Sequence, residues 1–177
     1  MAVTRFRPAL LLVPILSVAG LWISAALMNG GRPETIIEIS GPMPTLSGHA
    51  VAGPDVDPSI YRDRVVVVNF WASWCPPCRR EQPWLQRIQR DYGRDGVQVV
   101  GVDHRDGLAD ARSFVERFGV PYPSVWDPSG DLAPRFGVPY LPTTIIVDRS
   151  GELRYRLIGE QDEYTVRSLV EEVLSGA

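Results

Sequence analysis

The strongest constraint on the fold of this chain is an apolar, β-branched run that leads directly into its only two cysteines. The run Val65-Val66-Val67-Val68-Asn69-Phe70-Trp71 is followed closely by Trp74-Cys75-Pro76-Pro77-Cys78. A continuous β-branched run is typical of a buried parallel strand. Prolines suit the first turn of a helix, because no backbone donor is needed there. The sequence therefore predicts a strand-to-helix junction with Cys75 at the N-terminus of the helix.

This predicted position favours redox chemistry at the cysteine pair. The unpaired N–H groups and the positive end of a helix dipole stabilise a thiolate, and they lower the thiol pKa from about 8.5 to roughly 3.5 to 7.5. Only the thiolate attacks a disulfide. The C-x-x-C spacing of Cys75 and Cys78 beside a β-α-β pattern thus indicates disulfide exchange.

Two other interpretations of the pair, a structural disulfide and half of a zinc site, fit the sequence less well. Structural zinc takes four ligands at short spacings, whereas His49 and His104 are isolated and there is no second cysteine pair. A bridge that closes so short a loop adds little chain-entropy stabilisation. We therefore expect no metal site and no cofactor, apart from a redox-active disulfide between Cys75 and Cys78.

The N-terminal residues 1–28 predict membrane targeting. Ala9 to Met28 carries no charge and follows Arg5 and Arg7. As a helix of roughly 30 Å it can cross a bilayer core, with the arginines on the cytoplasmic side. A cleaved signal peptide, with a small-residue site at Ser24-Ala25-Ala26, is the alternative, although the apolar stretch is longer than an ordinary signal core. We favour an uncleaved anchor. In both cases the remaining chain lies outside the cytoplasm, where cysteines are normally oxidised.

Composition predicts one domain after this segment and argues against a nucleic-acid partner. Residues 29–42 contain Gly and Pro and are interpreted as a linker. Residues 43–177 then provide enough material for a single core. Acidic residues outnumber basic ones, 21 to 18, and no basic stripe is present. Lys is absent from the chain, which excludes lysine-based covalent chemistry.

Hydrophobic periodicity and turn signals predict the order of elements in the domain. The expected elements are an edge hairpin over 43–51, strands at 65–71, 97–102 and 124–126, helices at 76–92, 108–118 and 132–136, a hairpin of 145–148 with 153–158, and a helix at 163–174 capped by Asp162. The β-α-β order indicates parallel pairing. The predicted fold class is therefore α/β, with a central mixed sheet flanked by helices.

Three motifs support a resemblance to a known family. They are Asn69 to Glu81, which contains both cysteines, then Pro83, and then Leu141-Pro142-Thr143-Thr144. At this spacing the chain resembles the thioredoxin-like superfamily, and within it the membrane-anchored TlpA/ResA/CcmG (DsbE)-type thiol-disulfide oxidoreductases of bacteria. The resemblance covers Met43 to the C-terminus. The βα segment of residues 97–126 is similar to the insertion that separates this group from the minimal thioredoxin.

The resemblance implies roles for individual residues. Cys75 is expected to be the exposed nucleophile and Cys78 the more buried resolving thiol. Pro142 matches a cis-proline whose preceding backbone can pair with a substrate peptide, the alternative being an ordinary trans-proline turn. The other expected redox-motif and substrate-binding residues are Trp74, Pro76, Pro77, Leu141 and Thr143.

Four further positions refine the resemblance. Glu81 matches a glutamate of ResA-like proteins that raises the thiol pKa and assists proton transfer; the alternative is an exposed glutamate that complements the helix dipole. Asn69 stands where thioredoxin has a buried acid, so that acid's role is expected to be absent. Thr143 stands where the CcmG type usually has glutamate, which favours the TlpA/ResA side. Tyr140 stands where many relatives have glycine, and its role stays open.

The resemblance also implies a function. It implies a reductant that receives electrons from a membrane thiol donor and reduces apocytochrome c cysteine pairs, as in cytochrome c maturation, or other exported disulfides. It implies a single-pass location in the bacterial cell membrane with the domain extracytoplasmic, or secretion after signal cleavage. The main alternative is a general oxidant or isomerase. A peroxidase is less favoured, because Val68 and Ala72 occupy the Pro and Thr positions of the peroxiredoxin pattern. A haem or metal-binding module lacks further ligands.

Overall fold

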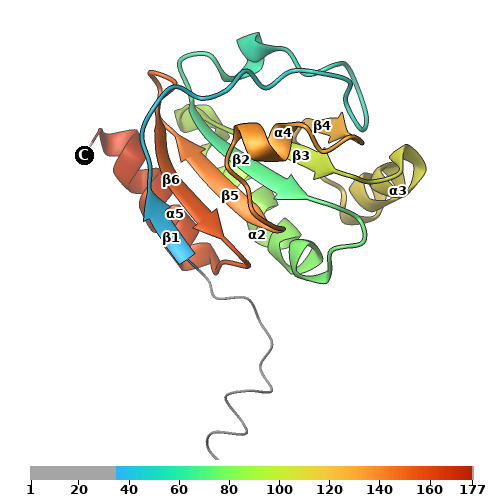
Figure 1. Ribbon diagram of the computed structural model, residues 1–177. Coiled ribbons are helices and arrows are strands. Elements are labelled where there is room, and N and C mark those ends of the chain that lie inside the picture. Colours follow the sequence, from blue (N-terminus) through green and yellow to red (C-terminus); the bar gives the residue numbers. More distant parts are fainter. Residues whose placement is uncertain (1–34, 177) are drawn as a thin grey trace, which may run out of the picture. The chain divides into compact units, whose positions relative to one another are not determined.

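A computed structural model, which describes residues 35–176, shows six strands in one sheet of order β1-β6-β5-β2-β3-β4 (Figure 1). β2 pairs in parallel with β3, and β3 with β4, whereas β2–β5, β5–β6 and β6–β1 are antiparallel, so the predicted mixed sheet is confirmed. The strands are β1 Thr35–Glu38, β2 Val65–Trp71, β3 Val97–His104, β4 Ser124–Asp127, β5 Thr143–Val147 and β6 Leu153–Ile158.

Helices cover both faces of this sheet. The α-helices are α2 Pro76–Tyr92, α3 Leu108–Phe118, α4 Leu132–Arg135 and α5 Glu163–Ser175, with 3₁₀ turns η1 Pro58–Tyr61 and η2 Gly93–Asp95. Figure 1 shows α4 on one face and α2 and α5 on the other. α5 begins as predicted, since the Asp162 side chain accepts a hydrogen bond from the Thr165 N–H at 2.9 Å and caps the helix.

β2 is the central strand of the core, because every one of its residues is buried. Its alternate residues enter different clusters. Val65 and Val67 pack with residues of α2 and α5, whereas Val66 and Val68 pack with residues of α4 on the opposite face. This two-sided burial explains why the strand has a continuous rather than an alternating apolar pattern.

The edge hairpin predicted over residues 43–51 was wrong. This segment contains no strand; Gly48 and Ala50 form only isolated antiparallel bridges, to Val56 and Val125. The reason is that its apolar residues serve different parts of the core: Leu46 and Val51, both fully buried, belong to separate hydrophobic clusters. The N-terminal strand is instead β1, which lies in the stretch interpreted as a linker and pairs with β6.

The predicted membrane segment, residues 1–28, lies outside the described residues. Within residues 35–176, no helix has the length and apolar character needed to cross a membrane.

The sheet brings the predicted motifs together at one edge. The carboxyl end of β2 lies beside the amino end of β5, because Asn69 pairs with Thr144 and Phe70 with Thr143 in antiparallel register. The loop after β2 contains Cys75 and the loop before β5 contains Pro142. Antiparallel pairing of these two strands therefore places both loops at the same end of the domain.

Candidate active site

Cys75 is the N-cap residue of α2, as the sequence predicted. Its Sγ accepts a hydrogen bond from the Cys78 N–H at 3.3 Å, and prolines occupy the first turn of the helix. The two cysteines form a disulfide, with their Cα atoms 5.3 Å apart. A backbone donor of the helix N-terminus therefore points at the sulfur atom that would become a thiolate after reduction.

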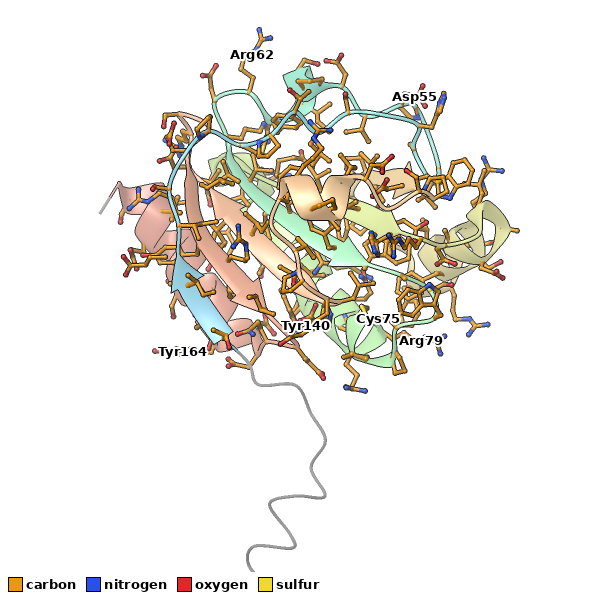
Figure 2. The ribbon with its side chains drawn as sticks, in the orientation of Figure 1. Asp55, Arg62, Cys75, Arg79, Tyr140 and Tyr164 are labelled. Carbon is orange, nitrogen blue, oxygen red and sulfur yellow. A yellow bond between two sulfur atoms is a disulfide. The ribbon has the colours of Figure 1, made fainter. Side chains whose placement is uncertain are left out.

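The expectation of an exposed nucleophile was wrong for this oxidised form. Cys75 is 3% exposed and Cys78 is 1% exposed, so the two sulfurs differ little in burial. Both lie in a hydrophobic cluster with Trp71 and Phe114, whose rings stack with centroids 4.5 Å apart. The neighbouring Trp74 is instead exposed, at 55%. Figure 2 shows Cys75, Arg79 and Tyr140 at the same edge of the domain, opposite Asp55 and Arg62.

The loop before β5 contains the predicted cis-proline, since the Leu141–Pro142 bond is cis. The trans alternative is thereby excluded. Leu141 packs against the hydrophobic cluster that contains both cysteines. The Thr143 hydroxyl donates a hydrogen bond to the Tyr140 carbonyl at 2.7 Å, and Thr143 is fully buried. The Thr143 side chain thus supports the loop from inside instead of facing a partner.

Glu81 lies inside the domain, which excludes the exposed alternative. It is 1% exposed and follows Cys78 by three residues, so both side chains lie on the same face of α2 one turn apart. Its Oε1 accepts a hydrogen bond from the Gln161 N–H at 2.9 Å, and its Oε2 accepts one from Asn69 Nδ2 at 3.3 Å. Desolvation raises the pKa of Glu81 to about 8, against the smaller opposing effect of these two donors.

Asn69 has a closer connection to Glu81 than the sequence suggested. Its Nδ2 also donates to Thr144 Oγ1 at 3.1 Å, while its buried Oδ1 has no hydrogen-bond partner among the described residues. An amide group that rotates by 180° exchanges donor and acceptor. Asn69 can therefore donate to the Glu81 carboxylate, or accept from the protonated acid. The Gln161 contact had no sequence signal, because it uses a backbone N–H.

Asp103 is a second buried acid that the sequence analysis missed. It lies at the carboxyl end of β3, opposite Trp71 of β2, and is 0% exposed. Neither of its carboxyl oxygens has a donor among the described residues. Desolvation, followed by the charge of Asp106, raises the pKa of Asp103 to about 8. The available signal was its position, because the carboxyl ends of parallel strands β2 and β3 meet at one sheet edge.

The loop that contains Asp106 holds the chain just before Cys75. Asp106 Oδ2 accepts a hydrogen bond from the Ser73 N–H at 2.6 Å. On the other side, the Arg79 guanidinium donates to the Ser73 carbonyl, with Nη2 at 2.6 Å. Trp74 Nε1 donates to the Arg105 carbonyl at 3.3 Å. Both polar backbone groups of Ser73 are thus bonded to side chains. A hollow of about 340 Å³ lies here, lined by residues that include Trp74, Arg79, Asp106 and Phe114.

This architecture defines a class of protein: a thioredoxin-like thiol-disulfide oxidoreductase, with a C-x-x-C disulfide at a helix N-terminus and a cis-proline loop packed against it. The chain belongs to the AhpC/TSA family, whose model matches residues 39–156. It is 34% identical over 142 residues to the thiol:disulfide interchange protein DsbE of Allochromatium vinosum, covering 79% of this chain and 71% of that protein.

Two further comparisons agree with this class. The thiol-disulfide oxidoreductase ResA of Geobacillus kaustophilus is 29% identical over 167 residues, which cover 94% of each chain. The crystal structure of a putative thiol:disulfide interchange protein DsbE from Chlorobium tepidum superposes with a TM-score of 0.72 at 28% identity, covering 79% of this chain and 99% of that chain. The protein is accordingly a thiol-disulfide oxidoreductase of the ResA/CcmG/DsbE type.

Proposed function

We propose that this protein reduces disulfides of exported proteins, with the haem-binding cysteine pair of apocytochrome c as its substrate in cytochrome c maturation. The observation that supports this direction is the buried Glu81, one turn from Cys78 on α2. A nearby carboxylate raises the pKa of a thiol and destabilises the thiolate. The strongest oxidants of this chemistry owe their potential to a stabilised reduced form. A destabilised thiolate therefore favours transfer of electrons out of the cysteine pair.

The proposed reaction begins with the reduced protein. The Cys75 thiolate attacks one sulfur of the substrate disulfide, an S–S bond forms, and the other substrate sulfur leaves as a thiolate that takes up a proton. Glu81, in its ionised form, then accepts the proton of the Cys78 thiol. The resulting Cys78 thiolate attacks the Cys75 sulfur, which forms the Cys75–Cys78 disulfide and releases the second substrate thiolate. Two electrons pass to the substrate, and the protein is left in the oxidised form described above.

The substrate would bind across the rim formed by the two loops. A cis bond at Pro142 leaves the preceding backbone free to pair with an extended peptide, and the buried Thr143 hydroxyl holds the Tyr140 carbonyl in place. Trp74 offers an exposed ring, and Pro76 is also exposed. Tyr140, which is partly buried, adds a phenol ring on the other side of the rim.

The proposed setting is the outer face of a bacterial cell membrane. Residues 1–28 would form a single-pass anchor, or a signal that is cleaved, and a membrane thiol donor would regenerate the reduced cysteine pair. Fractionation of cells after an alkaline wash tests this part: a chain that stays with the membrane supports the anchor, whereas release of the chain supports cleavage.

The equilibrium reduction potential of the full chain tests the direction of electron flow. In dithiothreitol or glutathione buffers we expect a value near that of thioredoxin, about −270 mV. A value near that of DsbA, about −120 mV, would overturn the proposal in favour of a general oxidant.

A trapping experiment tests the substrate. Cys78→Ser leaves Cys75 without its resolving partner, so mixed disulfides with exported proteins should accumulate and be identifiable by mass spectrometry. The matched control is the double variant Cys75→Ser, Cys78→Ser, which should trap nothing. Apocytochrome c among the trapped partners supports the specific substrate. If the single variant traps no more than the control in an intact cell envelope, the catalytic assignment fails.

A further inference from the structure

Asp103 has an environment that suits a carboxylic acid and not a carboxylate. It lies between two tryptophans in the sheet, opposite Trp71 on β2 and Trp126 on β4, and is fully buried. No N–H or O–H group of the described residues donates to either oxygen. The charges that act on it most strongly are those of Asp106 and Asp127, which have its own sign. A buried carboxylate with no donor and two acidic neighbours is costly, whereas a neutral acid retains a donor of its own.

The candidate acceptor for that donor is Asp106, three residues further along the chain. After desolvation, the charge and the side chain of Asp106 are the next causes that raise the pKa of Asp103, and both favour its protonated form. Asp106 itself has donors: its Oδ2 accepts from the Ser73 N–H at 2.6 Å and its Oδ1 from the Gly107 N–H at 2.8 Å. Its backbone carbonyl accepts from Trp126 Nε1 at 3.0 Å. Asp106 is therefore supported as a carboxylate, and Asp103 is not.

We propose that Asp103 donates a hydrogen bond to the Asp106 carboxylate, and that this carboxyl pair positions Ser73 and Trp74, and through them the nucleophile Cys75. Asp103 is a positioning residue in this scheme, because it acts through Asp106. The inference rests on the proposed role of Cys75 as the attacking thiolate.

Only a few covalent and hydrogen bonds separate Asp106 from Cys75. Ser73 is two residues before Cys75, and its N–H is bonded to Asp106 while its carbonyl is bonded to Arg79. Trp74 is bonded to the next loop residue through the Arg105 carbonyl. If Asp103 became an anion, repulsion would drive the partly exposed Asp106 carboxylate toward water and away from the Ser73 N–H. One proton shared by the two carboxyl groups therefore leaves a single negative charge on the pair. With that charge, the hydrogen bond from the Ser73 N–H to Asp106 is retained.

The decisive comparison is between two substitutions of Asp103 in the full chain. Asp103→Asn retains a donor, the Nδ2 amide, and we expect it to reduce oxidised glutathione at the wild-type rate. Asp103→Ala removes the donor, and we expect a rate about tenfold lower, since a hydrogen bond to a charged group is lost. The pH profile of Cys75 alkylation should be unchanged in Asp103→Asn and displaced in Asp103→Ala. If the Asn variant is as slow as the Ala variant, the donor role is excluded.

Asp106→Ala keeps the experiment informative if Asp103→Ala fails to fold, because Asp106 is only partly buried. It should lower the rate by about the same factor, and the double variant should be no slower than either single one, since the pair acts as a unit. Glu116→Gln on α3, an exposed acid, is the matched control and should react like the wild type. An Asp106→Ala variant that also reacts like the wild type would overturn the proposal.

A spectroscopic measurement tests the protonation state directly. The infrared spectrum of the wild type at pH 7 should contain a carboxylic-acid C=O band that is missing in Asp103→Asn and present in Glu81→Gln. An unchanged spectrum in Asp103→Asn excludes the protonated acid. Failure of the proposed redox function is a separate result, because it would show as a Cys75→Ser variant that still reduces glutathione.

Discussion

Glu81 on α2 and Asp103 at the end of β3 are two buried acids, and they differ in what surrounds their oxygens. Both are almost fully buried, and burial raises the pKa of each to about 8. Glu81 accepts hydrogen bonds from Gln161 and Asn69, one on each oxygen. Asp103 accepts none from the described residues, and after desolvation the negative charge of Asp106 raises its pKa further.

The comparison shows that two acids with similar burial can have different roles, one in proton transfer and the other as a fixed hydrogen-bond donor. N–H donors stabilise the charged form of an acid. Glu81 can therefore lose and regain a proton while its oxygens keep hydrogen-bond partners. Asn69, with one amide group that can donate or accept, suits both states of Glu81. A neighbouring carboxylate stabilises only the protonated form, which suits Asp103 as a fixed donor. A raised pKa by itself therefore does not identify a proton-transfer group; the partners of its oxygens do.

The largest expected effect tests the two sulfurs that the acids are proposed to serve, Cys78 for Glu81 and Cys75 for Asp103. Cys75→Ser should abolish reduction of a disulfide-containing peptide, while Cys78→Ser should retain the first step and accumulate the mixed disulfide. Both are followed by mass spectrometry of the trapped protein. If a Cys75→Ser variant still turns over, Cys75 is not the nucleophile, and the roles proposed for both acids in its reaction fail.

The next effect concerns stability and pH. The folded-state pKa of each acid is about 8, above its value in an unfolded chain, so between pH 6.5 and 8 the folded protein holds protons that the unfolded chain has released. The free energy of unfolding should therefore fall as pH rises through this window, by about 2 kcal/mol for each acid, and level off above pH 8. Urea unfolding of the oxidised protein measures it.

Glu81→Gln and Asp103→Asn should each remove about half of that loss and together nearly all of it, because the sites do not share a partner. A wild type whose stability is constant from pH 6.5 to 9 would show that neither acid is held neutral. If only one of the two substitutions reduces the fall in unfolding free energy with pH, only that acid is held neutral in the folded protein.

A smaller effect is expected at Gly101, which lies in β3 two residues before Asp103. Gly101 lies opposite Asn69 in β2, and a Cβ there would meet Ser124 Oγ at 2.2 Å and Trp71 Nε1 at 2.7 Å. Gly101→Ala should cost about 1 to 3 kcal/mol of unfolding free energy, measured by denaturant unfolding. Ser124→Ala should restore part of this loss in the double variant, because Ser124 Oγ has no partner among the described residues. A fully stable Gly101→Ala variant would contradict the close packing of Gly101 against Ser124 and Trp71.

The smallest effect is expected at Thr143, the first residue of β5. Thr143→Val removes the hydrogen bond to the Tyr140 carbonyl and should cost about 1 kcal/mol. Thr143→Ser retains the hydroxyl and is the matched control. Thermal unfolding measures both variants, and the dependence of stability on pH should be unchanged in each, because neither substitution touches an acid. A Thr143→Val variant with an altered pH dependence would show that the loop before β5 is coupled to one of the two acids.

Local patterns predicted most of the elements well. The β-branched run at 65–71, the prolines after Cys75 and the Asp162 cap each determine structure within a few residues, and all three are confirmed. β1 was missed, because its four residues are exposed and show no buried periodicity. The hairpin over 43–51 was wrong because the apolar residues there serve separate core clusters, which a local pattern cannot reveal.

The features of the site also fall into two groups, those that short motifs predict and those that depend on tertiary contacts. By itself the sequence determined the position of Cys75 at a helix N-terminus and, through the resemblance, the cis bond at Pro142, since both depend on short motifs. Only the tertiary structure decided that Cys75 is buried, that Glu81 lies inside the domain and that Asp103 is buried without a donor among the described residues. The physical reason is that burial and the partners of a charged group depend on segments far apart in the chain, such as Gln161 beside Glu81, which meet only when the sheet is assembled.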